Sequence, residues 1–480
     1  MKDNYKWRAL SCTTIGALLS VMSGSTLIIA LPEIMKDLKC DMGTITWILM
    51  GYMLILTIFV PSIGRTADMF GRKKLYVGGF GVFTAASLLC ALSNTGWQLL
   101  IYRLIQAVGG AFMVANSTAI VADAFPKSEL GKALGINTMF ISIGSVIGPI
   151  LGGFLVSIGW RYIFYLNLPI GIIGTIWAGV HLKEIYNHEA KQKFDWLGTL
   201  TFTVSMLALL MALTIGCFTG WFDIKVIILI VLFIISMGAF IKIENKIEQP
   251  MLDLNLFKNR LLAFAYASNF FNGIARGSVT FLMIFYLQGI KGIDPITAGI
   301  FLAPFAVSML IVSPISGSLS DKYGSRALSS IGLLISAVGL LGLVAINSNT
   351  SIVELMIWMF IMGIGSGFFF SPNTNSIMGA VPDNKRGIAA GVRTMLNNAG
   401  SVLSIAFSMA IIGTSLTPEA MQGLFLGTQV GSNGIAVGSF ISGLRIVFII
   451  SFIFSILAAI LSYMRGPAPV WNEAELQNAN

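Results

Sequence analysis

The chain has 480 residues, of which 56% are hydrophobic and 11% charged, and its formal net charge is +9. Soluble domains carry about a quarter charged residues, so this composition, with a mean hydropathy of +0.84, excludes a soluble protein and indicates an integral membrane protein. The four cysteines lie far apart and the two histidines share one polar stretch. The sequence therefore predicts no metal site, no cofactor and no enzyme active site.

A helix needs about 20 mostly apolar residues to cross the hydrocarbon core of a bilayer. Fourteen segments of the chain meet this description, which predicts an all-α membrane protein. They fall near residues 9–31, 44–63, 75–94, 98–121, 133–157, 162–182, 196–216, 224–242, 262–287, 296–318, 327–346, 352–374, 388–413 and 441–464.

The basic residues predict the orientation of these spans. An even number of spans places both termini on one side of the membrane. Most of the 30 lysines and arginines fall in segments that are cytoplasmic if the N-terminus is inside the cell. The positive-inside rule therefore predicts cytoplasmic termini in a multi-pass protein of the plasma membrane. The basic residues that give the positive net charge then face the anionic inner leaflet, and no nucleic-acid partner is predicted.

An internal repeat divides the chain. The frame G-x-x-x-D-x-x-G occurs twice, at a spacing of 253 residues, at Gly64, Asp68 and Gly71 and again at Gly317, Asp321 and Gly324. Each copy follows the second helix of a six-helix set if helices seven and eight are an insertion. This 6+2+6 plan predicts four parts: a six-helix bundle over 1–182, a two-helix insertion over 183–260, a second bundle over 261–464 and a cytoplasmic tail over 465–480. Parallel halves of this kind place a substrate cavity between them.

The first copy of the frame contains groups that could hold two helices together. Its glycines permit a tight turn in the loop between helices two and three. Asp68 and Arg72 are one helical turn apart and can pair, and the carboxylate could also cap a neighbouring helix. We interpret the segment as a conformational latch, and Gly317, Asp321 and Gly324 as its counterpart in the second half. The alternative is an ordinary basic cytoplasmic loop, which would require neither glycine nor Asp68.

The fourth predicted helix contains Arg103, about five residues from its start. An arginine inside a span is costly unless it faces protein or water, so we interpret Arg103 as a coupling charge. The alternative is that its side chain extends to the outer interface.

The fifth predicted helix carries glycines four residues apart, which predict close packing against another helix. A proline within this run frees a backbone carbonyl and kinks the helix. The residues are Gly144, Gly148, Pro149 and Gly152.

Polar residues at helical spacing mark two further helices. Asn272 and Arg276 share one face of the ninth helix, and Arg393 and Asn397 share one face of the thirteenth. We interpret these four residues as candidates for the cavity wall. The alternatives are structural pairing for Arg276 and extension to the cytoplasm for Arg393. A cavity with arginines and no carboxylates suits anionic, zwitterionic or neutral amphiphiles better than lipophilic cations.

Together these motifs resemble the major facilitator superfamily. The segment 64–74 looks like its motif A, and 144–153 matches its antiporter motif. The stretch beginning at Arg103 resembles motif B, with Ala107 in the place of a glycine. Segments 160–171 and 194–198 resemble the fourteen-helix drug:proton antiporter (DHA2) branch.

This resemblance implies the major facilitator fold, in which two six-helix bundles rock about a central cavity in response to proton entry. It also implies a charge relay of Asp68, Arg72 and Asp123 on the cytoplasmic face. The chain departs from the family in its first helix, where Ser23 replaces the usual aspartate. No predicted helix carries a carboxylate at its middle, although such a group is the natural proton carrier because partial burial raises its pKa.

These observations predict a secondary active exporter of small amphipathic drugs or drug-like compounds. It would work as a monomer in the lipid bilayer and as a proton-coupled antiporter by alternating access. One alternative is an exporter of lipids or of anionic or zwitterionic amphiphiles, with atypical or no proton coupling. Others are an importer or facilitator, and a membrane-embedded enzyme or sensor. No G-x-x-x-x-G-K-[ST] motif is present, so ATP is not expected to drive transport directly.

Overall fold

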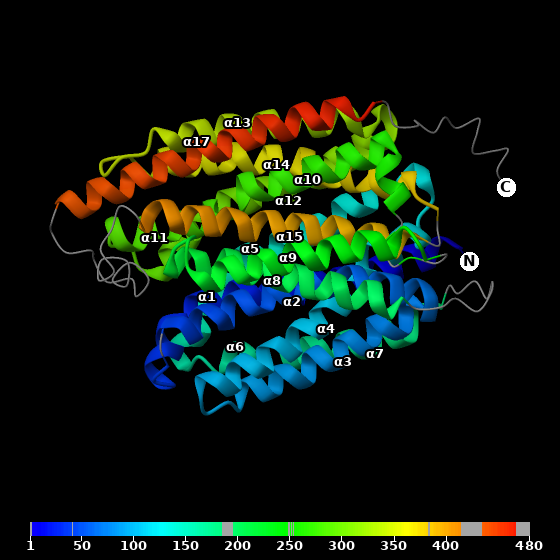
Figure 1. The fold of residues 1–480 in the computed structure, drawn as a ribbon, viewed down its shortest axis with the longest axis horizontal. Coiled ribbons are helices and arrows are strands. Elements are labelled where there is room, and N and C mark those ends of the chain that lie inside the picture. Colours follow the sequence, from blue (N-terminus) through cyan, green and yellow to red (C-terminus); the bar gives the residue numbers. More distant parts are fainter. Residues whose placement is uncertain are drawn as a thin grey trace.

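A computed structural model describes residues 2–40, 42–184, 195–247, 250, 252, 254–382, 385–413 and 434–466 of the chain. Fourteen helical segments in this part are long and apolar enough to cross a membrane. The start of the first helix (Lys2–Asp37) and the end of the last described helix (Gly434–Met464) lie at the same end of the molecule (Figure 1). The predicted number of spans and the all-helical architecture are therefore confirmed.

The first half of the chain forms one bundle. Its helices are α1 (Lys2–Asp37), α2 (Met42–Phe70), α3 (Arg72–Ala91), α4 (Gly96–Ala124), α5 (Leu130–Ile158), α6 (Tyr162–Tyr165) and α7 (Asn167–His181). A short 3-10 helix, η1 (Lys127–Glu129), precedes α5. The helices α6 and α7 together make the sixth span.

The second bundle follows a two-helix segment made of α8 (Trp196–Thr219) and α9 (Ile224–Glu244). A 3-10 helix, η2 (Leu254–Lys258), leads into it. Its helices are α10 (Arg260–Gly277), α11 (Val279–Phe285) with the π-helical turn η3 (Tyr286–Ile290), α12 (Pro295–Tyr323), α13 (Ser325–Val344), α14 (Ile352–Ala380), α15 (Arg386–Gly413) and α17 (Gly434–Met464). The boundaries predicted for the two bundles, the insertion and the tail stay predictions.

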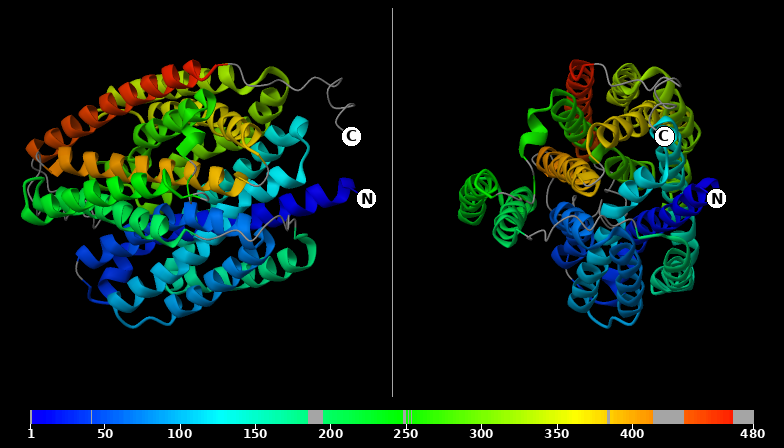
Figure 2. Two further views of the ribbon diagram at one scale, coloured as in Figure 1. Left: turned by 45° about the vertical axis from the view of Figure 1, so that its right-hand side comes forward. Right: turned by 90° about the vertical axis from the view of Figure 1, so that its right-hand side faces the viewer.

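The bundles meet most extensively at two helix pairs, α2 with α15 and α5 with α12. The α8–α9 pair lies to one side of both bundles, and α8 packs against α2 and α15 (Figure 2). Most clusters of buried apolar side chains stay within one bundle. The largest cluster instead contains residues of both, among them Ile58 and Val121 from the first and Ile377 and Ile388 from the second.

Most of the helices are longer than predicted, and the loop predicted at 64–74 is wrong in its extent. The α2 helix continues to Phe70 and α3 begins at Arg72, so only Gly71 interrupts them. Gly71 has φ of 104° and Gly324 has φ of 78°, in the left-handed region that favours glycine. Both copies of the repeated frame therefore end in the same sharp break between two helices.

The ninth predicted helix is not continuous. It breaks at Ser278, whose N–H donates to the Ser404 hydroxyl of α15 at 3.0 Å. Between the last two predicted spans, residues 414–433 lie outside the described residues, and 434–440 form the start of α17. Residues 467–480 of the predicted tail also lie outside the described residues.

Candidate functional site

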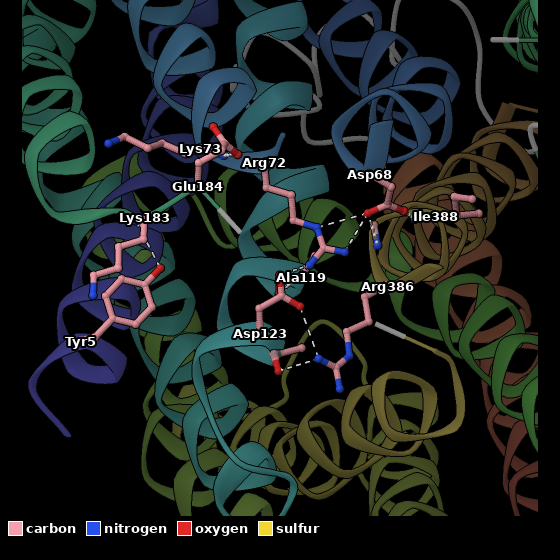
Figure 3. Close-up of polar contacts among 12 residues, drawn as sticks. Tyr5, Asp68, Arg72, Lys73, Ala119, Asp123, Lys183, Glu184, Arg386 and Ile388 are labelled. Atoms are coloured by element: carbon pink, nitrogen blue, oxygen red, sulfur yellow. Dashed lines mark hydrogen bonds and ion pairs between the residues drawn. The ribbon is translucent and has the colours of Figure 1, made fainter. Parts of the chain in front are cut away.

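Asp68 links the two bundles at their cytoplasmic end. Its carboxylate accepts hydrogen bonds from the N–H groups of Gly387 and Ile388, each at 3.2 Å, in the first turn of α15 (Figure 3). Arg72, beyond the break at Gly71, donates to the same carboxylate from Nη2 at 2.7 Å and from Nε at 3.1 Å. The predicted Asp68–Arg72 pair therefore forms, and the carboxylate also lies at the positive end of a helix dipole.

Asp123 extends this contact into a group of four charged residues, which we call the Asp68 cluster: Asp68, Arg72, Asp123 and Arg386. Asp123 on α4 accepts from Nη1 of Arg72 and, at 3.3 Å, from Nη1 of Arg386 (Figure 3). Arg386 also donates to the Ala122 carbonyl at 2.9 Å. Two carboxylates and two guanidinium groups thus balance one another across the bundle boundary. Arg386 could not be recognised from the sequence as a member of this cluster, because one basic residue in a predicted cytoplasmic segment carries no signal of its own.

The first turn of α3 is held separately. The Glu184 carboxylate accepts from the N–H groups of Lys73 at 3.2 Å and Lys74 at 3.3 Å (Figure 3). Gly71 has no side chain to cap this helix, so Glu184 supplies the cap. The cap fixes the turn from which Arg72 projects.

Asp321 makes the equivalent backbone contact in the other direction. Its carboxylate on α12 accepts from the N–H groups of Gly131 at 2.8 Å and Lys132 at 3.0 Å, in the first turn of α5. Asn375 of α14 donates to it from Nδ2 at 3.0 Å and to the Ser320 hydroxyl at 3.0 Å. We call these residues, Asp321, Asn375 and Ser320 with the two amides, the Asp321 cluster.

The Asp321 cluster differs from the first in its charges. Ser325 stands 253 residues after Arg72, at the corresponding position. Arg465 is buried nearby, but its guanidinium donates to Asn373 Oδ1 and Ser376 Oγ, both at 3.0 Å, and to the Ser325 carbonyl. Both carboxylates accept from two backbone amides, and the side chain added to them is an amide, Asn375, at Asp321 and an arginine, Arg72, at Asp68.

Glycines allow the paired helices to touch at both clusters. A Cβ atom on Gly64 would overlap the Gly387 carbonyl, and one on Gly317 would overlap the Gly131 carbonyl. One to two turns further into the membrane, Gly391 lies against Pro61 and Gly135 against Pro314 in the same way. These four crossings, Gly64–Gly387, Gly317–Gly131, Gly391–Pro61 and Gly135–Pro314, bring the α2–α15 and α5–α12 backbones into direct contact.

The glycines of the predicted antiporter motif lie against α1. A Cβ on Gly148 would overlap the Ser25 hydroxyl, one on Gly152 would lie 3.0 Å from the Thr26 Cα, and one on Gly144 would lie 3.3 Å from Leu18. The predicted close helix contact is confirmed. Pro149 falls inside the continuous helix α5, and its side chain lies outside the described residues.

Arg103 is buried inside the first bundle, with 1% of its surface exposed, and does not extend to the outer interface. Its Nη1 donates to Ser23 Oγ at 3.0 Å and to the Gln106 side chain. The guanidinium lies 4.4 Å from the centre of the Tyr52 ring. Ser23 is the position where the resembled family keeps an aspartate, so Arg103 here has a hydroxyl where that family would place a carboxylate.

A central cavity of about 470 Å³ lies between the bundles. Residues of α1, α2, α4 and α5 line it from one side, and residues of α10, α11, α12, α14 and α15 from the other. Arg276, Arg393 and Asn397 are on its wall, as predicted for three of the four candidates. The fourth, Asn272, is 2% exposed and is not among the lining residues. Asn272 lies one turn before Arg276 on α10 and is buried within the bundle.

The cavity is separated from the cytoplasmic clusters by apolar side chains. On α4, α14 and α15, the buried residues Val121, Ile377 and Ile388 lie about one turn closer to the cytoplasm than cavity-lining residues of the same helices. Arg393 therefore lines the cavity above this layer and does not extend to the cytoplasm.

One ion pair holds the outer end of the first bundle. The Asp37 carboxylate accepts from the Trp160 indole and from Arg161 Nη1, both at 2.8 Å. These two donors hold the pKa of the Asp37 carboxyl below its ordinary value. The contact joins the end of α1 to the turn between α5 and α6.

The chain matches the family model of the Major Facilitator Superfamily over residues 13–196 and 265–479. It is 33% identical to the riboflavin transporter RibZ of Clostridioides difficile over 86% of this chain and 89% of that protein. It is 32% identical to multidrug resistance protein 3 of Bacillus subtilis over 88% and 82% of the two chains. It is 30% identical to the multidrug resistance protein Stp of Mycobacterium tuberculosis over 85% and 76%.

Solved structures share the fold at low identity. The human organic anion transporter MFSD10 superposes with a TM-score of 0.66 at 14% identity, over 94% of this chain and 99% of that one. The proton:xylose symporter XylE superposes with the same TM-score and identity over the whole of both chains. Sequence and fold agree, and the chain belongs to the Major Facilitator Superfamily of membrane transporters, with multidrug resistance proteins among its relatives.

Proposed function

We propose that the protein is a secondary active exporter of small amphipathic compounds, which works by alternating access. The observation that supports this most directly is the cytoplasmic closure of the central cavity. Asp68 and Asp321 each cap a helix of the opposite bundle, and a layer of apolar side chains fills the space beneath the cavity. Breaking both contacts would open the cavity to the cytoplasm, which is the movement that alternating access requires.

The relatives support an organic cargo. Their names include a riboflavin transporter and several multidrug resistance proteins. The cavity wall combines Met53, Met113, Phe305 and Phe370 with hydroxyl and amide groups. Methionine and phenylalanine surfaces adapt to different shapes, so the wall suits amphipathic molecules.

We first propose that protons supply the energy for transport. The Asp68 cluster would then be the site that responds when the bundles move. A specific observation favours the alternative of atypical or absent proton coupling. Among the described residues that line the central cavity, none is an aspartate or a glutamate. The buried Arg103 likewise contacts the hydroxyl of Ser23.

The test uses inside-out vesicles or proteoliposomes loaded with the protein. An imposed pH gradient is expected to drive uptake of a fluorescent amphiphile and to release protons from the lumen in exchange. Transport that persists unchanged after a protonophore collapses the gradient would exclude proton antiport. Absence of transport of every amphiphile under every gradient would exclude export itself.

Ser23→Asp provides an internal comparison. Because Ser23 Oγ lies 3.0 Å from Arg103 Nη1, an aspartate at this position would reach the guanidinium. We expect this variant to respond to the pH gradient more strongly than the natural chain if a carboxylate beside Arg103 is what proton coupling requires. An equal response in the two chains would show that coupling, where present, does not depend on this position.

A further inference from the structure

Two arginines reach the central cavity without a carboxylate to balance them. Arg276 comes from α10 and Arg393 from α15. Among the described residues, no hydrogen bond or ion pair to the Arg276 guanidinium is found, and its Nε is buried without a partner. Arg393 makes one long hydrogen bond, at 3.4 Å to the Thr394 hydroxyl, and its Nε is also buried and unpaired. A buried cation without a partner is costly, so an anion that reaches these groups is stabilised.

Arg276 is held in place by aromatic rings. Its guanidinium carbon lies 4.9 Å from the centre of the Phe370 ring and 5.8 Å from that of Phe305. These rings orient the guanidinium by cation–π attraction and use none of its N–H donors. The five donors of an arginine form a planar fork that matches two oxygens of a carboxylate or phosphate. The group is therefore oriented and still free to bind.

A second cavity continues from the first toward the outer face. It has a volume of about 290 Å³ and shares Arg276, Thr280 and Phe305 with the central cavity. Its other walls are largely apolar and include Ile28, Ile29, Phe281, Ile284 and Phe285. No acidic residue lines either cavity in the part of the chain that the structure describes. Arg276 thus stands between a cavity whose wall includes hydroxyl and amide groups and one whose wall is largely apolar.

We propose that Arg276 and Arg393 bind the acidic group of an anionic amphiphile, whose aromatic or aliphatic body extends over Phe305 into the outer cavity. This proposal rests on the proposed export function and names the class of its cargo: a carboxylate, sulfonate or phosphate joined to an apolar body. Lipophilic cations are disfavoured, because they would meet two positive charges and no negative one.

The charge of such a cargo has an energetic consequence. The interior of a cell is electrically negative, so a membrane potential drives an anion outward. At 100 mV this corresponds to about a fifty-fold concentration ratio for one charge. An anion exporter therefore has a driving force that requires no proton-carrying carboxylate in the cavity.

The test compares two probes with the same aromatic body, pyrenebutyrate and a pyrenylbutyl trimethylammonium salt. Binding to the purified protein is measured by fluorescence, and transport is measured in proteoliposomes of neutral lipid. We expect the anionic probe to bind about tenfold or more tightly than the cationic one, the range of one charge-assisted bidentate contact. Transport of the anion should rise with an imposed potential, negative on the cytoplasmic side.

The variants assign the preference to the arginines. Arg276→Gln should weaken binding of the anionic probe about tenfold or more and leave the cationic probe unaffected or better bound. Arg276→Lys keeps the positive charge but not the planar fork of donors, so its loss of affinity for the anionic probe should be smaller. Arg260→Gln is the matched control, because Arg260 lies on the same helix and donates to the Met464 carbonyl outside the cavity. Its binding should equal that of the natural chain.

Three results would overturn the proposal. The first is tighter binding of the cationic probe. The second is a preference for the anion that survives in both Arg276→Gln and Arg393→Gln. The third is an anionic probe that does not bind while a neutral amphiphile is transported, which would leave the export function standing without the anion site. A pyrenyl phosphate and vesicles containing anionic lipid, added as competitors, distinguish a phosphate or lipid headgroup from a carboxylate cargo.

Discussion

The Asp68 cluster and the Asp321 cluster lie at the same end of the molecule and make the same backbone contact with different side chains. In each, an aspartate near the end of one helix accepts two N–H groups at the start of a helix in the other bundle. In each, glycines bring the two backbones together. Around Asp68 the remaining partners are arginines and a second aspartate, whereas around Asp321 they are an amide and a hydroxyl.

This difference separates two contributions to the closure. The helix-end contact and the glycine crossings are common to both halves, so the bundles meet in this way with and without an ionic network around the aspartate. The ionic network occurs around Asp68 alone among the described residues of the two clusters, and it connects α2, α3, α4 and α15. We therefore propose that the Asp68 cluster is the part that responds to changes of charge during transport. The Asp321 cluster has a mainly structural function.

The largest predicted effect is that of removing the charge of Asp68. In Asp68→Asn, Arg72 loses the carboxylate that accepts from its Nη2 and Nε, and removing one partner of a buried ion pair costs about 3–5 kcal/mol. We expect the initial export rate in inside-out vesicles to fall by at least about tenfold. In Asp321→Asn no arginine loses a partner, and the variant removes only a negative charge at a helix end, which is worth about 0.3–1 kcal/mol. The export rate should therefore fall less than about fivefold.

The comparison requires equal amounts of folded protein, which size-exclusion profiles after purification provide. The conservative variants Asp68→Glu and Asp321→Glu keep the charge and should retain more activity than the asparagine variants. Equal losses in Asp68→Asn and Asp321→Asn would contradict the assignment of different functions to the two clusters.

The next effect is steric and should be the same in both halves. Gly64→Val and Gly317→Val each place a side chain against a carbonyl of the opposite bundle, and overpacking of this kind costs about 1–3 kcal/mol. We expect both variants to favour the open cytoplasmic side. The readout is labelling of Thr374→Cys, in the cavity wall, by a maleimide applied from the cytoplasmic side. The rate should rise about tenfold.

The labelling requires that the four native cysteines be replaced by serine. Gly238→Val is the matched control, because a Cβ on Gly238 of α9 would meet no atom within 4 Å. Its labelling rate should equal that of the starting protein. A rise for the Gly64 variant alone would show that the two crossings do not contribute equally to the closure.

The sequence was sufficient to predict the helices and the repeat, because a bilayer requires long apolar segments and the G-x-x-x-D-x-x-G frame holds one spacing. The Asp68–Arg72 pair could be predicted because both residues lie within one short segment. Arg386 could not, since it contacts Asp123 across a distance of 263 residues in the chain. Pairings of that kind depend on how helices meet, which no local pattern specifies.

The arginines within the spans show the same limit. Their presence in apolar segments marked them as unusual. The sequence does not show what surrounds each of them. The structure places Arg103 in a hydrogen-bonded contact with Ser23 and Gln106 within one bundle, and Arg276 on a cavity wall. Asn272 shares a helix face with Arg276, yet it is buried within the bundle. A helix face is broad enough to cover both a cavity wall and an adjoining helix contact, so spacing alone does not distinguish them.

The smallest predicted effect concerns the neutral partner of Asp321. Asn375→Ala removes two hydrogen bonds of 3.0 Å, to Asp321 Oδ1 and Ser320 Oγ. A neutral hydrogen bond typically contributes about 1 kcal/mol, and water at the cytoplasmic face can replace these two, so the export rate should change less than about threefold.

Asn375→Asp is the sharper variant, because it places a second carboxylate beside Asp321 at unchanged size. The two carboxylates repel each other when both are ionised, so export by this variant should be weaker at pH 8 than at pH 6, where one proton can be shared. The natural chain and Asn375→Ala should not show that added dependence on pH. If Asn375→Ala were as impaired as Asp68→Asn, the amide would be as important to closure as the ionic network, and the distinction between the clusters would be lost.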